Sequence, residues 1–251
     1  MKNYLIFIFS LSLIPQLVTA QDITAIIKEA ENLDAQMKEK PSFEKYKEAL
    51  FINPQNTVAL NKCSELCSRI GKRENTQQQR NNYYELAKYY AETSLKIDPN
   101  NSASNCVMAI ALGRITMEKS GREKINAAKN IKKHLDIALK NDPSNYKAWH
   151  VLGRWHYELS NLNIIERTAV KLFFGGMPQT SMNESIAAFE KANNLVKNFS
   201  LNYFELAKAY KKNDQLNKAI QCLNTILILP NKTEEDETIK ADSRKLLKDW
   251  L

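Results

Sequence analysis

The side chains that could do chemistry are few, and their spacing matches no catalytic motif. Three histidines occur, His134, His150 and His156. His150 and His156 are six residues apart, so they do not share a helical face, and we expect all three to have structural roles. The sequence contains no Walker loop, nucleophile elbow, zinc-protease motif or Cys-x-x-Cys. We therefore predict a protein that is not an enzyme, with no catalytic residue, metal or cofactor.

Four charged residues between positions 154 and 167 are spaced closely enough to interact. Arg154 and Glu158 are four residues apart, so on a helix their side chains can pair. Glu166 and Arg167 follow closely and could extend the pair into a network, since charges tolerate burial only when paired. The cluster either fixes the segment that follows it or contacts a ligand. Both interpretations stay open from the sequence.

Four cysteines are present: Cys63, Cys67, Cys106 and Cys222. Cys63 and Cys67 are four apart on one expected helix, which is poor geometry for a disulfide. Both fall on its apolar face, where a free thiol behaves as a small hydrophobe. We expect buried thiols, with a pair between Cys106 and another helix as the alternative.

The overall composition favours an all-helical protein. The chain has 251 residues with 43% hydrophobic and 25% charged side chains, but only 6 Gly and 7 Pro. A sandwich or barrel needs many turns rich in Gly and Pro, and a dinucleotide-binding fold needs clustered glycines. The expected helices lie at 22–39, 42–52, 57–70, 82–97, 102–118, 122–141, 145–160, 164–173, 182–196, 200–212, 215–229 and 234–250.

A repeated phrase indicates that these helices form hairpins. Segments 51–56, 96–101 and 140–145 each end a helix at a proline and continue with Asn, Ser or Thr, which are residues that cap the next helix. The prolines Pro54, Pro99 and Pro143 are spaced by about 45 residues, a period typical of stacked helical hairpins. The last helix, acidic at its start and apolar near its end, is expected to cap the stack.

The hairpins resemble tetratricopeptide (TPR) repeats, in which small residues let two helices approach and large ones fill the groove between neighbours. The matching positions are Trp149, Leu152 and Gly153 in one hairpin, and Tyr203, Leu206, Ala207, Tyr210, Ala219, Ile220 and Leu223 in the next. The first three units exceed the usual 34 residues, with the excess around 71–82, 113–125 and 161–181. We predict a single TPR-like right-handed superhelix over 21–251, with elongated units.

Segment 151–195 also resembles the regulator of microtubule dynamics family. The positions that carry this resemblance are Leu152, Gly153, Arg154, Trp155, Tyr157, Glu158, Glu166, Arg167, Leu172, Phe173, Gly175 and Pro178. Ile164 and Ile165 stand where the family often has an aromatic residue. The resemblance implies a binding scaffold rather than a catalyst. Members in animals associate with microtubules, or tether organelle membranes and bind phospholipid in the helical cavity.

The first twenty residues have the pattern of an export signal. Lys2 provides the positive charge, residues 4–14 form an apolar run, and the small residues 18–20 precede Gln21. The run is too short for a permanent membrane span. We expect cleavage after Ala20 and a location in a bacterial periplasm.

Two further segments offer binding surfaces. The apolar insertion 164–177 either plugs the concave face, covers an apolar ligand, or touches a membrane. Seven basic and two acidic residues between Arg114 and Lys133 form either a solvated helix face or a site for anionic lipid or an acidic partner. Nucleic acid is not expected. The candidate contact residues are Arg154, Trp155, Glu158, Arg167, Phe173 and Lys132.

The sequence thus favours a scaffold in the cell envelope that binds a protein or peptide partner on its concave face. The first alternative is a module that binds phospholipid, fatty acid or another apolar small molecule. The second is a minor hydrolase or an accessory subunit of an enzyme.

Overall fold

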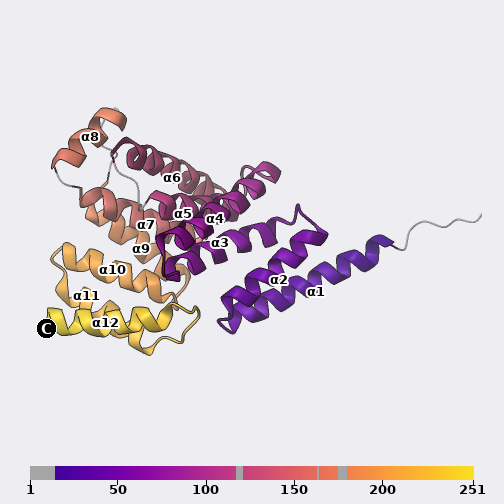
Figure 1. The fold of residues 1–251 in the computed structure, drawn as a ribbon. Helices are drawn as coiled ribbons and strands as arrows, with labels where there is room; N and C mark the ends of the chain where they lie inside the picture. The colour runs from indigo at the N-terminus through magenta and orange to yellow at the C-terminus, as the bar shows by residue number, and fades with distance from the viewer. Residues whose placement is uncertain (1–14, 117–120, 163, 175–179) are drawn as a thin grey trace, which may run out of the picture.

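The computed structural model describes residues 15–116, 121–162, 164–174 and 180–251, and within these ranges every element of regular secondary structure is a helix (Figure 1). The helices are α1 (Pro15–Ala35), α2 (Glu39–Ile52), α3 (Thr57–Arg73), α4 (Gln77–Ile97), α5 (Ser102–Thr116), α6 (Gly121–Asn141), α7 (Tyr146–Ser160), α8 (Ile164–Phe174), α9 (Met182–Leu195), α10 (Ser200–Lys212), α11 (Leu216–Ile228) and α12 (Asp236–Trp250). The all-helical prediction is confirmed.

The repeated proline phrases place the helix boundaries by N-capping. The side chain of Asn56 accepts a hydrogen bond from the backbone N–H of Ala59 at 2.9 Å, and that of Asn145 accepts one from Ala148 at 3.0 Å. Asn101 accepts the N–H of Ser104 in the same way. Each cap satisfies a backbone donor that the first turn of a helix leaves without a partner.

Several boundaries differ from the prediction, and two of them have a clear local cause. The first helix ends at Ala35 rather than at residue 39, because the chain turns at Met37, whose φ is 58°. α4 begins at Gln77 rather than at residue 82, because Thr76 and Gln79 form a capping box there. The excess length of this unit is therefore extra helix, and only residues 74–76 connect α3 to α4.

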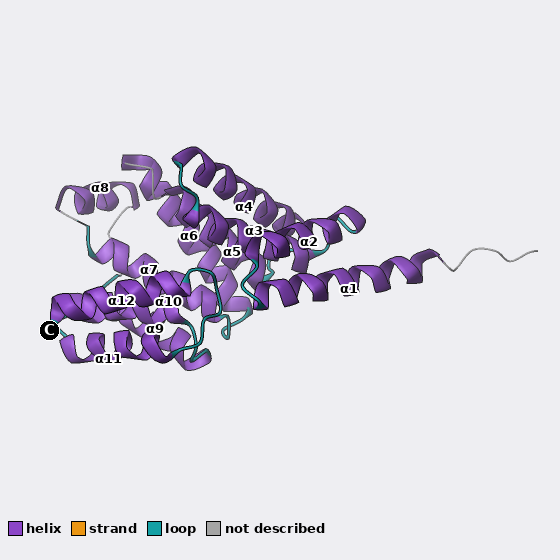
Figure 2. Cartoon of the chain, turned by 60° about the horizontal axis from the view of Figure 1, so that its bottom comes forward, coloured by secondary structure: helices purple, strands orange, loops and turns teal. Residues whose placement is uncertain are grey.

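The helices stack as antiparallel hairpins with their first members in one row. α3, α5, α7 and α10 contact one another in succession, and each also packs against its hairpin partner in the outer row formed by α4, α6, α9 and α11 (Figures 1 and 2). α8 is the inserted element, and it lies against α6. This arrangement is the predicted TPR-like superhelix.

The last helix caps the stack as expected. α12 contacts both α10 and α11. Its Ile239 is buried in the C-terminal core, and Leu246, Leu247 and Trp250 pack against that core. The cap covers apolar surface that a further repeat would otherwise cover.

Gly153 explains how closely α7 and α9 pack. A Cβ at this position would lie 2.6 Å from the nearest ring atom of Phe189, which is fully buried. The glycine at the eighth repeat position is therefore required by a real helix contact. Gly113 on α5 is different, because a Cβ there would meet nothing within 4 Å.

The two ends of the superhelix are joined by charged groups. The carboxylate of Glu234, in the loop before α12, accepts a hydrogen bond from the backbone N–H of Glu39 at 2.8 Å. Glu39 in turn accepts from the N–H of Glu234 at 3.2 Å and from Arg73 at 2.6 Å. Lys72 also pairs with Glu235. These contacts bring the start of α2 and the end of α3 against the loop before α12.

A second ion pair connects α3 with α7 across α5. Lys147 donates to both carboxylate oxygens of Glu65, each at 2.6 Å. Burial alone would raise the pKa of Glu65, but Lys147, Lys62 and Arg69 lower it to about 2. Burial would lower the pKa of Lys147, but Glu65 raises it. The pair is thus stabilised in its charged form.

Alanine at the two helical glycines should have opposite effects. Gly153→Ala forces Cβ against the Phe189 ring, so we expect it to destabilise the fold by about 1–3 kcal/mol. Gly113→Ala lowers the conformational entropy of the unfolded chain and causes no clash, so it should stabilise the fold by about 0.5–1 kcal/mol. Thermal unfolding of both variants measures this. Equal effects of the two substitutions would contradict the close packing of α7 on α9.

The Glu65 pair should make stability depend on acidity. The pKa of Glu65 is depressed in the folded state, so its contribution is complete above about pH 4.5 and is lost as pH falls toward about 2. Glu65→Gln should cost about 3 kcal/mol at neutral pH, because Lys147 loses its partner. The difference from the unmodified protein should shrink as the wild-type carboxylate becomes protonated.

Denaturant unfolding between pH 2 and 7 measures how the stability lost in Glu65→Gln depends on pH, with Glu44→Gln as the control. Glu44 pairs with Lys47 at 2.8 Å, but its side chain is 65% exposed, so its removal should change stability little at any pH. A Glu65→Gln deficit that stays constant with pH would count against the charged pair.

Candidate functional site

The inner row of helices borders a cavity of about 970 Å³. Its walls come from α3, α5 and α7, from residues 196–201, and from the segment 232–239 that the end-to-end ion pairs hold in place. Aliphatic side chains such as Ile110, Ile125 and Val151 share this lining with charged and amide groups. A cavity of this size fits the range of ligand sites, which are mostly apolar with a few placed polar groups.

Basic side chains from three successive inner helices meet in this cavity: Lys72 of α3, Arg114 of α5 and Arg154 of α7. Burial and the charges of Arg114 and Arg154 lower the pKa of Lys72 to about 8, although Lys72 pairs with Glu235. Burial, with Arg154 nearby, also lowers the pKa of Arg114. Arg154 thus disfavours the charge of both Lys72 and Arg114.

Arg154 is the best-paired member of this group. It donates to Glu158 at 3.0 Å, as the sequence predicts, and to Glu205 of α10, also at 3.0 Å. Glu205 is almost fully buried and holds Lys208 as well. Burial alone would lower the pKa of Arg154, but Glu205 and Glu158 raise it. Arg154 therefore braces α7 against α10 and still lines the cavity.

Trp155 and Lys132, two of the predicted contact residues, lie together. The indole N–H of Trp155 donates to the carbonyl of Ala128 at 2.9 Å, and the Lys132 ammonium lies 5.8 Å from the centre of a Trp155 ring. Lys132 also pairs with Asp136 at 2.7 Å. Trp155 is buried and anchors α7 on α6, with part of its side chain at the cavity wall.

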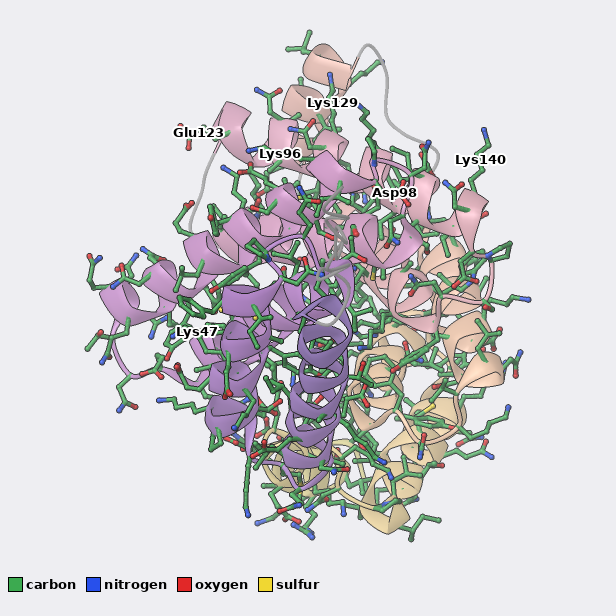
Figure 3. The ribbon with its side chains drawn as sticks, turned by 90° about the vertical axis from the view of Figure 1, so that its right-hand side faces the viewer. Lys47, Lys96, Asp98, Glu123, Lys129 and Lys140 are labelled. Atoms are coloured by element: carbon green, nitrogen blue, oxygen red, sulfur yellow. The ribbon has the colours of Figure 1, made fainter. Side chains whose placement is uncertain are left out.

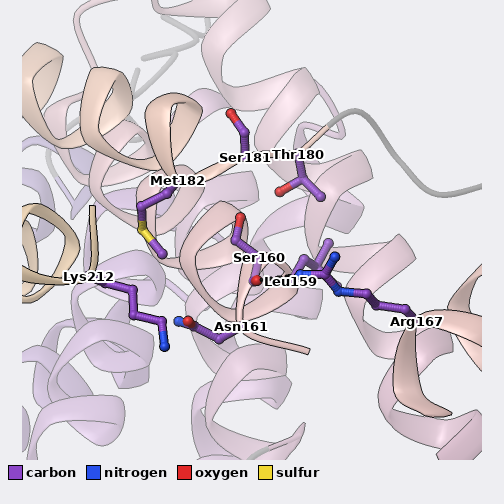
Figure 4. A pocket seen from close by; sticks show the side chains of 8 residues that line it. All are labelled: Leu159, Ser160, Asn161, Arg167, Thr180, Ser181, Met182 and Lys212. Carbon is purple, nitrogen blue, oxygen red and sulfur yellow. Dashed lines mark hydrogen bonds between the residues drawn. The ribbon is translucent and has the colours of Figure 1, made fainter. Parts of the chain in front are cut away.

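Arg167 has a different environment from that of Arg154. It donates to the carbonyls of Leu162 and Ser160, at 2.9 and 3.0 Å, and so satisfies acceptors at the end of α7. It also borders a smaller hollow of about 300 Å³, into which Lys212 of α10 points from the opposite side (Figure 4). The side chain of Phe173 lies outside the described part of the chain.

The inserted helix α8 borders the large cavity. Val170 is buried and lines it, as does Glu166, whereas Leu172 on the same helix is 75% exposed. Of the predicted insertion 164–177, residues 175–177 fall outside the described ranges. The described residues of the insertion form α8, which lies at the edge of the cavity beside α6.

Most of the predicted basic stripe lies on α6, but Arg114 does not. Lys124 and Lys133 of this stripe are exposed on α6. Lys140, beyond the stripe on the same helix, is also exposed and projects from the molecule in Figure 3. Arg114 instead belongs to the inner helix α5 and lines the cavity. Sequence reasoning missed the separate roles of Arg114, Lys72 and Glu205. The inner-row position of α3, α5 and α10 was the signal that could have identified them.

The histidines have structural partners. His150 is buried and its Nδ1 lies 2.9 Å from Oδ1 of Asn202, while burial lowers its pKa to about 4. His134 lies 2.8 Å from Asn105, and His156 lies 3.1 Å from Thr180. Burial lowers the pKa of these two as well. All three favour the neutral form at pH 7 and hold neighbouring helices or loops together.

The cysteines agree with the expectation of buried thiols. All four are buried and unpaired, and burial raises the pKa of each thiol. Among the described residues, no group of three or more His, Cys, Asp or Glu side chains could hold a metal ion. Over the same residues, no helix has both the length and the apolar character that crossing a bilayer requires.

Solved structures with a similar fold include a TPR protein. A thermophilic TPR protein from Thermus thermophilus aligns with a TM-score of 0.62 at 15% identity, covering 91% of this chain and 98% of its own. PilF of Pseudomonas aeruginosa aligns with a TM-score of 0.51 at 14% identity, covering 92% of this chain and 87% of its own. These likenesses establish the fold class.

Sequence comparisons identify the family. Human regulator of microtubule dynamics protein 2 is 30% identical over 171 residues, which are 68% of this chain and 42% of the human protein. Regulator of microtubule dynamics protein 1 of Caenorhabditis elegans is 25% identical over 63% of this chain and 70% of its own length. The chain thus spans about two fifths of the human relative. The family model for regulator of microtubule dynamics protein 1-3 matches residues 26–250, and the chain belongs to that family.

Proposed function

We propose that the protein is a non-catalytic scaffold that holds a segment of a partner protein in the cavity of its inner helices. The observation that carries this proposal is the cavity lining, which combines polar groups from α3, α5 and α7 with aliphatic side chains. An extended peptide offers backbone hydrogen bonds and side chains of both kinds, so it matches such a surface.

The distribution of polar groups favours a peptide over a purely apolar ligand. Ser68, Thr116 and Asn198 contribute neutral hydrogen-bonding groups to different parts of the lining, and Lys62 and Lys147 add charges at the α3 side. The Ser68 hydroxyl is buried and has no partner within the protein, so a ligand without hydrogen-bonding groups would leave it unsatisfied and lose affinity. A peptide can offer donors and acceptors to such groups at several points along its length.

We further propose that the scaffold works in a bacterial cell envelope. The support for this is the sequence of the N-terminal segment, with Lys2, the apolar run 4–14 and the small residues before Gln21. In the full chain, α1 runs continuously through this position, from Pro15 to Ala35. Cleavage after Ala20 would leave most of α1 and its contact with α2.

A second candidate function is binding of an apolar small molecule or lipid. The aliphatic part of the lining, to which Ile125, Ile131, Leu162 and Val170 contribute, favours it. The cavity volume of about 970 Å³ lies at the upper end of typical small-molecule sites.

Site-specific photo-crosslinking in living cells tests the peptide proposal. Ile110 on α5 lines the cavity, whereas Tyr89 on α4 is 60% exposed and absent from the lining. A photo-reactive phenylalanine derivative at position 110 should crosslink to a polypeptide partner, because it faces the bound segment. The same group at position 89 is the matched control and should not. Crosslinks of equal yield at both positions would exclude the cavity as the specific site.

Native mass spectrometry of the protein purified from its own cells separates the two candidates. We expect the chain to begin at Gln21 and to carry either no small molecule or a peptide. A stoichiometric mass that extracts as phospholipid or fatty acid would instead establish the second candidate. A chain that retains residues 1–20 would contradict the proposed export.

A further inference from the structure

Arg114 stands out among the cations that the inner helices α3, α5 and α7 contribute to the cavity, because no ion pair compensates its charge. Every other basic side chain contributed there by α3 and α7 lies within 4.0 Å of a carboxylate: Lys62, Arg69, Lys72, Lys147 and Arg154. Among the residues described, no carboxylate forms an ion pair with Arg114. Its Nε is also buried and has no hydrogen-bond partner.

The surroundings of Arg114 make its charge destabilising when the cavity holds no ligand. Its closest charged neighbours include Arg154, which repels it, and Glu205, which already binds Arg154 and Lys208. A cation that is removed from water without a partner destabilises the fold. Such a group is retained at a functional site when a ligand supplies the missing charge.

We propose that Arg114 binds a carboxylate of the partner segment, at a point where aliphatic side chains of that segment fill the neighbouring cavity wall. A guanidinium presents donors in a planar fork that matches the two oxygens of a carboxylate. Ile110, one turn before Arg114, and Val151 on α7 supply apolar surface in the same cavity. The inference rests on the proposed peptide-binding function and specifies the chemistry of its ligand.

The carboxylate can come from two sources, the C-terminus of a peptide or an Asp or Glu side chain within it. Two synthetic libraries of short peptides with randomised sequence distinguish them, one ending in free carboxylates and the other in amides. The libraries are passed over immobilised full-length protein, and the retained peptides are sequenced by mass spectrometry. Enrichment confined to the first library assigns a C-terminus, and enrichment of Asp or Glu in the amide library assigns a side chain.

Three variants test whether Arg114 is responsible for binding the enriched peptides. Arg114→Met keeps most of the aliphatic stem and removes the charge, so the affinity of an enriched peptide should fall by about tenfold to a hundredfold. Arg114→Lys keeps the charge but not the fork and should retain part of the affinity. Lys133→Met is the matched control, because Lys133 is an exposed cation of the same basic run that does not line the cavity. It should bind as the unmodified protein does.

The thermal stability of the empty protein provides a second readout. Because Arg114→Met removes an uncompensated cation, its Tm should rise by about 2–4 °C. A fall in Tm would show that Arg114 stabilises the fold and would overturn the inference. So would retained peptides without acidic preference, or equal affinities for Arg114→Met and the unmodified protein. If neither library yields a retained peptide, the proposed peptide-binding function itself fails.

Discussion

The carboxylate of Glu39 is the group on which the shape of the molecule most depends. It is fully buried, and it accepts hydrogen bonds from Arg69, Arg73 and the backbone of Glu234. A buried carboxylate is stable only when donors surround it, so the three elements that supply them are held together. In return, the Glu234 carboxylate caps the first turn of α2, where Lys38 forms no side-chain cap.

This connection changes what the concave face can do. An open stack of hairpins presents a broad groove to water, but here the segment 232–239 lies across from α3 and closes a cavity. Water is partly excluded from the charges inside, which strengthens their mutual effects. Inside the cavity, the cations Lys147, Lys62 and Arg69 depress the pKa of Glu65 against the effect of burial, whereas burial and Arg114 lower the pKa of Lys72. A ligand charge introduced there would interact strongly for the same reason.

The sequence predicts local features well and long-range ones poorly. Pro54, Pro99 and Pro143, each followed by a capping residue, were sufficient to place the hairpins, because caps and stops act within one helical turn. The contact between Glu39 and Glu234 joins residues 195 positions apart, and no periodicity encodes it. Arg154 has one partner of each kind, local and long-range. Its partner Glu158 is visible from i,i+4 spacing, but Glu205, which lies on another hairpin, is not.

Arg114 shows why composition alone misplaces functional groups. Counted along the chain, it belongs to a basic run that continues through Lys133, yet a change of helix separates it from the rest. The lysines of α6 are surface groups, whereas Arg114 is on the inner row of helices. Family membership specifies the stack that creates these two environments, and the side chains along the inner row decide what can bind there. Two relatives with the same hairpins but different inner-row charges should therefore hold different partners.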